Sequence, residues 1–197
     1  LPLKTLFLDT ETTGLHPPED KVVEIAIADS DGRVLLDTLV NPGRPIGFAT
    51  TIHHITDEMV SSAPFFESLL PDIQRIVRGN NIVIYNAGFD TKFFPDKLTG
   101  AGKISCAMLK FAPMFGETDA RRGSYKWQKL ANAAKHIGYR WEGNAHRALA
   151  DVLATRALWH WMEHQSTGPA RPQFSVQECP HCATKNRIPK SRDPESA

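Results

Sequence analysis

The first part of the chain carries apolar runs that are too short for helices and are typical of strands. Thr5 to Asp9 is one such run, and it ends in a charged residue. Two further runs, Val22 to Ala28 and Val34 to Val40, flank the dipeptide Asp31-Gly32, which is a strong signal for a tight hairpin turn. The pattern therefore predicts three antiparallel strands at the start of the fold.

Apolar residues at helical spacing alternate with a further strand in the rest of the first 164 residues. Ile82 to Tyr85 is predicted to be that strand, and to be buried. A helix is expected over Phe65 to Val77, ending near Gly79, and another over Asp90 to Leu98, with an interruption near Pro95. A third is expected over Trp127 to His136, ending at Gly138. The last is expected from Asn144, a good cap residue, to about His164. A hairpin followed by strands that alternate with helices predicts an α/β fold, in which helices flank a mixed sheet.

The composition predicts one globular domain and a short appendage. The 197 residues are 41% hydrophobic and 23% charged, which is ordinary for a globular protein. After Gln165 the composition changes, because residues 165–197 hold five of the 14 prolines and no long apolar run. We expect a domain over residues 1–164 and a linker with a small tail over residues 165–197. No apolar run approaches the roughly 18 residues that span a bilayer, so no membrane partner is expected.

The net charge and the cysteine content exclude few classes of function. A formal net charge of +1 neither supports nor excludes a nucleic-acid partner, since bulk DNA binders are usually basic but an enzyme that grips a strand end needs no such excess. Three cysteines are too few for a disulfide scaffold, and two of them form one CxxC pair. A reducing, cytoplasmic setting is the simpler interpretation.

Two carboxylates follow the first apolar run. Asp9 and Glu11 are two residues apart, so on a strand their side chains point to the same face. Two like charges at this distance repel each other unless a cation lies between them, and hard divalent cations prefer oxygen ligands. On this spacing alone, a strand end with two solvated acids is the more common explanation.

Two further segments make a metal site more plausible than two solvated acids. Asp90 follows the second predicted apolar strand, and His146 and Asp151 stand at the start of the last helix. Taken singly, Asp90 is also compatible with a helix cap and His146 with a surface position. A spacing of five separates two side chains by about 140° on a helix, so His146 reaches the same site as Asp151 only if it lies at or before the first turn.

These three segments resemble the exonuclease motifs of the DEDD superfamily, in its His-containing branch, which includes the proofreading subunit of the bacterial replicative polymerase. The first motif is Asp-x-Glu followed by Thr-Gly-Leu, as at Asp9 to Leu15, and the second ends in Asn-x-x-Phe-Asp, as at Asn86 to Asp90. The third is His, four residues, Asp, as at His146 and Asp151. The segment Ile52 to Thr56 is similar to the family's Ile-His-Gly-Ile-Thr stretch, and the resemblance covers residues 3–162.

The resemblance implies a ribonuclease H-like fold and a 3′→5′ exonuclease that releases 5′-mononucleotides. Two Mg²⁺ or Mn²⁺ ions would be held by four carboxylates, and His146 would take a proton from the attacking water. The residues implied are Asp9, Glu11, Asp90 and Asp151 for the metals, and Thr10, Thr13, Gly14, Leu15, His53 and Asn86 for the substrate. Among the latter, Asn86 fits turn organisation better than contact with the substrate, and His53 is one of the weaker candidates.

The sequence of the first motif resembles that of the DNA-directed family members more than that of the RNA-directed ones. Single-stranded DNA or DNA 3′ ends are therefore expected to be preferred over RNA. The rival from another class is a catalytically silent nucleic-acid-binding module on the same fold. It is disfavoured because all five motif positions carry the expected residue types. Oligomeric state and pathway stay open.

Two positions depart from the family pattern. Tyr85 stands where family members often carry His, and His54 stands where the Ile-His-Gly-Ile-Thr stretch has glycine. Neither position holds metal in the family, so we expect an effect on local backbone shape or on end-binding rather than on the chemistry.

A basic stretch lies between the second and third motifs. Arg121, Arg122, Lys126 and Lys129 are interleaved with Tyr125 and Trp127. Aromatic side chains among cations can stack bases while neutralising phosphates, but for the arginines a solvated loop that leads into a helix is the favoured explanation. Trp127 and Leu130 are expected to face the core.

The tail contains Cys179-Pro-His-Cys182, which is similar to one knuckle of a zinc ribbon. No cysteine or histidine follows it, so a zinc site here would need ligands from another chain or a further segment. A redox dithiol is disfavoured, because no βαβ domain surrounds it. The third possibility is an unstructured tail, and metal analysis of a Cys179→Ser variant separates these.

Overall fold

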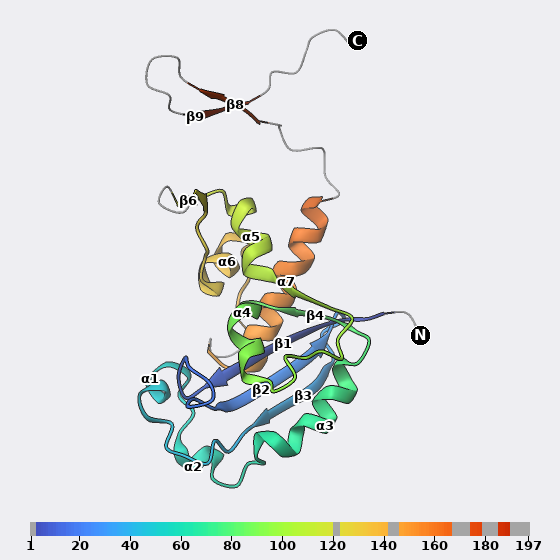
Figure 1. Cartoon of the computed structure of the whole chain (residues 1–197), viewed down its shortest axis with the longest axis vertical. Helices are drawn as coiled ribbons and strands as arrows, with labels where there is room; N and C mark the ends of the chain where they lie inside the picture. Colours follow the sequence, from blue (N-terminus) through green and yellow to red (C-terminus); the bar gives the residue numbers. More distant parts are fainter. Residues whose placement is uncertain (1–2, 120–122, 142–145, 167–173, 179–184, 190–197) are drawn as a thin grey trace. The chain divides into compact units, whose positions relative to one another are not determined.

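Five strands form a central sheet in the order β3-β2-β1-β4-β5 (Figure 1). The strands are β1 (Thr5–Thr12), β2 (Val22–Asp29), β3 (Val34–Leu39), β4 (Asn81–Ile84) and β5 (Lys103–Cys106). β1, β2 and β3 pair antiparallel, whereas β4 and β5 join the β1 side in parallel. The mixed sheet with three antiparallel strands first was predicted and is confirmed, and β5 was not predicted.

This computed structural model describes residues 3–119, 123–141, 146–166, 174–178 and 185–189. The chain divides into two compact units, Leu1–Glu163 and His164–Ala197. The first unit holds the sheet and the motif residues. Within the described residues, no helix combines the length and hydropathy that crossing a bilayer requires.

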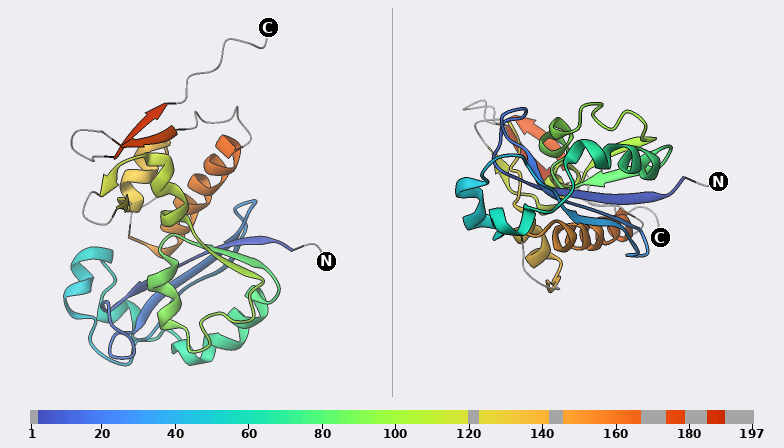
Figure 2. Two further views of the ribbon diagram at one scale, coloured as in Figure 1. Left: turned by 45° about the horizontal axis from the view of Figure 1, so that its top comes forward. Right: turned by 90° about the horizontal axis from the view of Figure 1, so that it is seen from below.

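Helices cover both faces of the sheet (Figures 1 and 2). The side chains of β1 alternate between the two faces, so they contribute to two apolar cores, one on each face. Leu6 and Leu8 belong to the core that α3 (Phe66–Val77) covers. Phe7 belongs to the opposite core, which is covered by α5 (Ala107–Phe115), α6 (Leu130–His136) and α7 (Ala148–Ser166). The same alternation continues toward Asp9 and Glu11, so it decides which face those carboxylates occupy.

Short elements fill the connections. Between β3 and α3 lie η1 (Gly47–Ala49), α1 (Thr50–His53) and α2 (Asp57–Val60), which close a third small apolar cluster around Val23 and Ile55. The remaining short elements are α4 (Ala87–Asp90), η2 (Thr91–Phe93), β6 (Thr118–Asp119) and β7 (Ser124–Tyr125).

The predicted helix over Asp90 to Leu98 is wrong. α4 ends at Asp90, where that helix was expected to begin, and one 3₁₀ turn follows it. Lys97 and Leu98 have φ angles of 49° and 59°, in the left-handed region that no α-helix contains. Leu98 is nevertheless fully buried, so its apolar character reflects core packing by a turn.

The helix predicted over Trp127 to His136 begins only at Leu130. The segment before it is held extended, because the Tyr85 hydroxyl donates a 2.7 Å hydrogen bond to the carbonyl of Gln128. Trp127 is 54% exposed, so the expectation that it faces the core is wrong, whereas Leu130 does pack against the core that contains Phe7.

The boundaries of the last helix also differ from the prediction. α7 begins at Ala148 and ends at Ser166, and the expected start at Asn144 lies outside the described residues. In the second unit, β8 (Phe174–Glu178) and β9 (Lys185–Pro189) form an antiparallel hairpin that the sequence did not predict.

Candidate active site

Asp9 and Glu11 project from the same face of β1. β1 runs on to Thr12, so both residues lie within the strand rather than beyond its end. They share the face of Phe7, which is the face that α7 covers. The strand therefore directs two carboxylates toward the first turn of α7.

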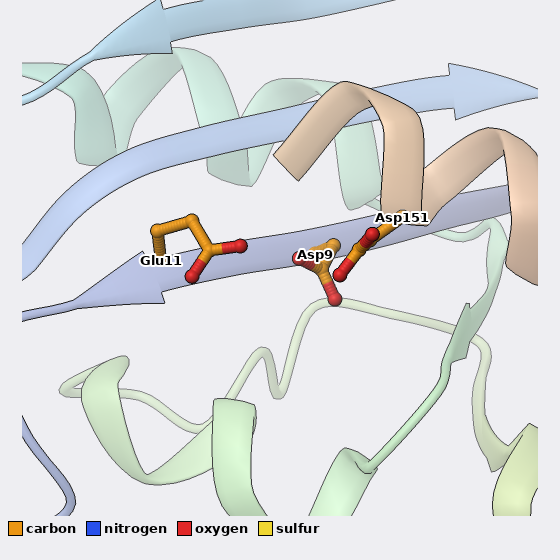
Figure 3. Close-up of side chains that lie close together, drawn as sticks. All are labelled: Asp9, Glu11 and Asp151. Atoms are coloured by element: carbon orange, nitrogen blue, oxygen red, sulfur yellow. The ribbon is translucent and has the colours of Figure 1, made fainter. Parts of the chain in front are cut away.

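Asp151 completes a three-carboxylate cluster. It lies in the first turn of α7, and one oxygen each from Asp9, Glu11 and Asp151 lie within 4.8 Å of one another. Figure 3 shows Asp9 between Glu11 and Asp151, with the acidic ends of all three turned toward one another. Oxygen ligands at this spacing suit a hard divalent cation.

Burial and mutual repulsion make these carboxyl groups hard to ionise without a cation. Burial, followed by repulsion from Asp90 and Asp151, raises the pKa of Asp9 well above its ordinary value. Burial and the charge of Asp151 raise the pKa of Glu11 to about 8. Burial raises the pKa of Asp151 to about 6, and the neighbouring His146 opposes that rise. A divalent cation would offset this repulsion, so the donor set fits a metal site.

Asp90 approaches the cluster from the other face of β1. It is 3% exposed, and its Oδ1 accepts a 2.7 Å hydrogen bond from the Thr10 hydroxyl. Burial raises the pKa of Asp90 to about 7, and the hydrogen bond from Thr10 lowers it. Asp90 is not one of the three carboxylates within 4.8 Å, although its charge still acts on Asp9. The side chain of Thr10, a predicted substrate contact, is thus occupied by Asp90.

His146 lies two residues before α7, so it meets the condition for reaching the same site as Asp151. Its φ is 63°, its side chain is exposed, and its backbone N–H donates to Oδ1 of Asp151 at 3.3 Å. A left-handed, non-glycine residue is strained, so surrounding contacts must hold it there. His146 and Asp151 also line the same cavity, of about 670 Å³.

Two residues that the sequence did not single out connect to this site. Glu24, on β2, is the cross-strand partner of Glu11, and it is 3% exposed. Its carboxylate forms an ion pair with Arg147, the neighbour of His146. No spacing rule indicates this contact, because the two residues are 123 positions apart and Glu24 stands in an apolar run.

The loop after β1 is built around Asp20. The Thr13 hydroxyl donates to Oδ1 of Asp20 at 3.1 Å, and the backbone N–H of His16 donates to its Oδ2 at 2.9 Å. Those hydrogen bonds, chiefly the one from His16, lower the pKa of Asp20. A Cβ at Gly14 would lie 2.4 Å from the Asp20 carboxylate, so a side chain there would displace that carboxylate. Leu15 is left 65% exposed on this loop.

His53 is buried rather than displayed. It is 2% exposed, and burial lowers its pKa. Its Nδ1 accepts a 3.1 Å hydrogen bond from the backbone N–H of Ile55, so Nε2 carries the proton of the neutral ring. Nε2 has no hydrogen-bond partner in the described part of the chain.

The two departures from the family pattern have local explanations. His54 ends α1 with φ 61°, the left-handed conformation that glycine adopts most easily. Tyr85 is nearly buried and uses its hydroxyl to hold Gln128.

Asn86 organises the start of α4. Its carbonyl accepts hydrogen bonds from the N–H groups of Phe89 and Asp90, at 2.8 and 3.2 Å. It also lines the cavity beside His146 and Asp151, as does Trp127.

Several predicted positions cannot be placed. Arg121, Arg122, Cys179 and Cys182 lie outside the described residues, so base stacking by the arginine stretch and zinc binding by the tail stay predictions. Of the other cations in that stretch, Lys126 forms a 2.7 Å ion pair with Glu117.

Comparisons with known proteins agree with this geometry. A family model described as Exonuclease matches residues 6–159. The chain is 42% identical over 166 residues to the uncharacterized exonuclease of Escherichia phage 186, covering 78% of this chain and 84% of that protein. It is 37% identical over 160 residues to the DNA polymerase III subunit epsilon of Treponema pallidum, covering 78% of this chain and 74% of that protein. Among solved structures it is similar to Exonuclease X in complex with 5′ overhanging duplex DNA, with a TM-score of 0.66 and 29% identity, covering 84% of this chain and 95% of that one.

Proposed function

Since this chain belongs to the exonuclease family, we propose that it hydrolyses the terminal phosphodiester at the 3′ end of a DNA strand and releases 5′-mononucleotides. The observation that carries the proposal is the three-carboxylate cluster of Asp9, Glu11 and Asp151, with His146 beside it. Removing a nucleotide needs a nucleophile, neutralised charge at phosphorus and a stabilised leaving oxygen, and each has a candidate here.

Asp9, Glu11 and Asp151 would hold divalent metal ions, with Asp90 as the fourth ligand. Two Mg²⁺ or Mn²⁺ ions, when bound, supply charge neutralisation at phosphorus and stabilise the attacking and leaving oxygens. The fit rests on three half-buried carboxylates whose oxygens lie within 4.8 Å of one another, and whose pKa values are raised by burial and by neighbouring negative charges. Asp90 joins the set on the strength of its charge interaction with Asp9.

His146 is proposed to accept the proton of the attacking water. An imidazole is the side chain best suited to accept and return a proton near neutral pH. Its exposed ring next to Asp151 supports this role, because the base must reach a water at the surface of the cluster.

The substrate end is proposed to lie against the loop after β1. Leu15 is exposed there, and Thr13 and Gly14 are fixed by Asp20, so the loop presents an apolar side chain from a rigid base. His53 contributes a buried N–H that has no hydrogen-bond partner among the described residues, which supports a role in end recognition. Trp127 is proposed to stack on a base of the strand, because it is exposed and lines the cavity that His146 and Asp151 share.

DNA is proposed as the preferred substrate. The solved structure of Exonuclease X contains DNA, and the relative from Treponema pallidum is named as a DNA polymerase subunit. Discrimination against RNA depends on contacts near the 2′ position of the sugar. The relative rates of hydrolysis of DNA and RNA therefore measure this preference.

A time course on single-stranded DNA and RNA of the same sequence tests the proposal. Each strand carries a 5′ label and is incubated with Mg²⁺, with Mn²⁺ or with EDTA. A ladder that shortens from the 3′ end only when metal is present is expected, faster for DNA. A circular strand, which has no end, should resist. Tight binding without hydrolysis would instead identify a silent nucleic-acid-binding module.

A further inference from the structure

Glu24 is a buried carboxylate in a strand that is otherwise apolar. Every residue of β2 before Asp29 is buried, and Glu24 is 3% exposed. A buried carboxylate is costly unless its oxygens are paired with donors. Its position is therefore informative, because its partners must supply those donors.

Within the described residues, the hydrogen bonds to the Glu24 carboxylate come from the two residues that follow His146. Oε1 accepts from Nε and Nη2 of Arg147, at 3.0 and 2.5 Å. Oε2 accepts from Nε of Arg147 at 3.1 Å and from the backbone N–H of Ala148 at 2.8 Å. With both oxygens occupied in this way, Glu24 is unsuited to be a further metal ligand.

The contact joins a strand to the first turn of a helix. Ala148 is the first residue of α7 and is fully buried, and N–H groups in a first helical turn lack partners within the helix. Glu24 supplies one such partner from β2, next to Glu11 on β1. The same side chain thus ties the helix that carries Asp151 to the sheet that carries Asp9 and Glu11.

His146 is held by its own backbone N–H and by the contacts of the two residues that follow it. Its own N–H donates to Asp151, and the next two residues are bound to Glu24. A residue with φ of 63° has an unfavourable backbone conformation that relaxes unless its neighbours are held. The pair of Glu24 and Arg147 is placed to hold it.

Charge supports the pairing. Glu24 lies close enough to raise the pKa values of Asp9, Glu11 and Asp151, whereas Arg147 lowers that of Glu11. Arg147 therefore offsets a charge that would otherwise add to the repulsion within the cluster.

We propose that Glu24 and Arg147 are positioning residues, which hold the first turn of α7 on β2 so that His146 and Asp151 face Asp9 and Glu11. This inference rests on the proposed function, in which His146 is the base. Neither residue touches the substrate, and both act through the backbone around His146.

The test compares Arg147→Ala, Arg147→Lys and the double variant Glu24→Gln/Arg147→Met, each alone and combined with His146→Ala. Turnover and KM are measured on 5′-labelled single-stranded DNA, and folding is followed by the melting temperature. The double variant removes both charges at once, so no uncompensated buried charge is left to unfold the protein. Arg75→Met, in the exposed ion pair with Asp72, is the matched control.

Loss of the pair is expected to lower kcat by about 10- to 100-fold with little change in KM, because small misplacements of reacting groups have effects of that size. Arg147→Lys should recover part of the loss, since lysine keeps the charge but not the two-pronged geometry. In the His146→Ala background the further loss should be smaller than in the wild type, because only the part that acts through Asp151 remains. Arg75→Met should behave as the wild type.

A double variant that melts near the wild-type temperature and keeps wild-type kcat overturns the proposal, as does a full multiplicative loss in the His146→Ala background. If the wild-type protein hydrolyses no DNA, the proposed function fails separately. The pair is then judged by Mn²⁺ affinity, measured by electron paramagnetic resonance. Weaker Mn²⁺ binding by Arg147→Ala supports positioning of Asp151, and unchanged binding rejects it.

Discussion

The hydroxyl of Thr10 donates a 2.7 Å hydrogen bond to the carboxylate of Asp90, a residue 80 positions later in the chain. Thr10 lies on β1 between the two carboxylates Asp9 and Glu11, but its side chain points to the opposite face. One strand thus presents two acids on one face and orients a third acid from the other. The consequence is that Asp90 depends on a neutral neighbour for its protonation state and orientation.

Thr10→Val is therefore expected to weaken metal binding. The substitution keeps the shape of the side chain but removes a donor from a buried carboxylate, which costs about 1–3 kcal/mol of unfolding free energy. The hydrogen bond lowers the pKa of Asp90, so its loss favours the protonated acid that competes with a metal ion. Mn²⁺ titration at pH 7 should show lower affinity for Thr10→Val, whereas Thr10→Ser, which keeps the hydroxyl, should bind nearly as well as the wild type.

Asp9→Asn is expected to remove hydrolysis while the fold is kept. Loss of an outer partner of a metal ligand already costs about 10- to 100-fold, and Asp9 is central in the cluster itself. Without metal, the variant should unfold at a higher temperature than the wild type, because one of several repelling acids has become neutral. Asp31→Asn, in the exposed hairpin turn, is the control. Wild-type degradation of DNA by Asp9→Asn would show that the site has been assigned wrongly.

The sequence predicted the parts of the site that depend on local periodicity. The alternation along a strand was enough to place Asp9 and Glu11 on one face. The spacing of five required His146 to lie at or before the first turn of the helix of Asp151, which begins at Ala148. The antiparallel start of the sheet followed from the hairpin signal, whereas the order of the five strands was not predicted.

The remaining features are set by tertiary contacts, which single-sequence patterns do not reveal. Leu98 lies in a turn that packs it into the core. Its apolar character therefore fitted a helical pattern although no helix forms there. Trp127 was expected to face the core. The hydrogen bond from Tyr85 to Gln128 holds the segment before α6 extended, and Trp127, which lies in that segment, is exposed. The ion pair between Glu24 and Arg147 joins residues that no local rule connects.

Trp127→Ala is expected to raise KM for single-stranded DNA about 5- to 100-fold, since stacking of one base on an aromatic ring is worth about 1–3 kcal/mol. The value of kcat should change little, because Trp127 is proposed to contact the strand rather than the reacting atoms. Trp127→Phe keeps a ring and should retain most of the affinity. An equal loss in both variants would point to a structural role for the indole, and no change in either would remove Trp127 from the substrate path.

His146→Ala is expected to bind Mn²⁺ with nearly wild-type affinity but to lose about 100- to 10,000-fold in kcat, the usual contribution of a general base. The separation follows from the structure, because the imidazole is exposed and Asp151, not His146, belongs to the carboxylate cluster. Titration by electron paramagnetic resonance and turnover on labelled DNA measure the two quantities on the same preparation. Retained turnover in His146→Ala would assign the proton transfer to another group.

The metal-free protein is expected to become less stable as the pH rises from about 4.5 to 8. In the folded state the pKa is about 8 for Glu11, about 7 for Asp90 and about 6 for Asp151, whereas the same groups titrate near 4 in the unfolded chain. Between these values the folded protein holds protons that the unfolded chain has released. The unfolding free energy therefore falls with increasing pH across this window.

Thermal melts in EDTA at pH 5 and pH 8 measure this effect, with the lower melting temperature expected at pH 8. Mg²⁺ or Mn²⁺ should shrink the difference, because a bound cation stabilises the ionised carboxylates that the higher pH produces. Glu11→Gln should flatten the pH dependence, since it removes a group whose pKa rises from 4.5 to about 8, while Glu67→Gln, at an exposed position of α3, should not. A metal-free protein that is equally stable at both pH values would mean that the acids are not held together before the metal binds, and that the cluster forms only in its presence.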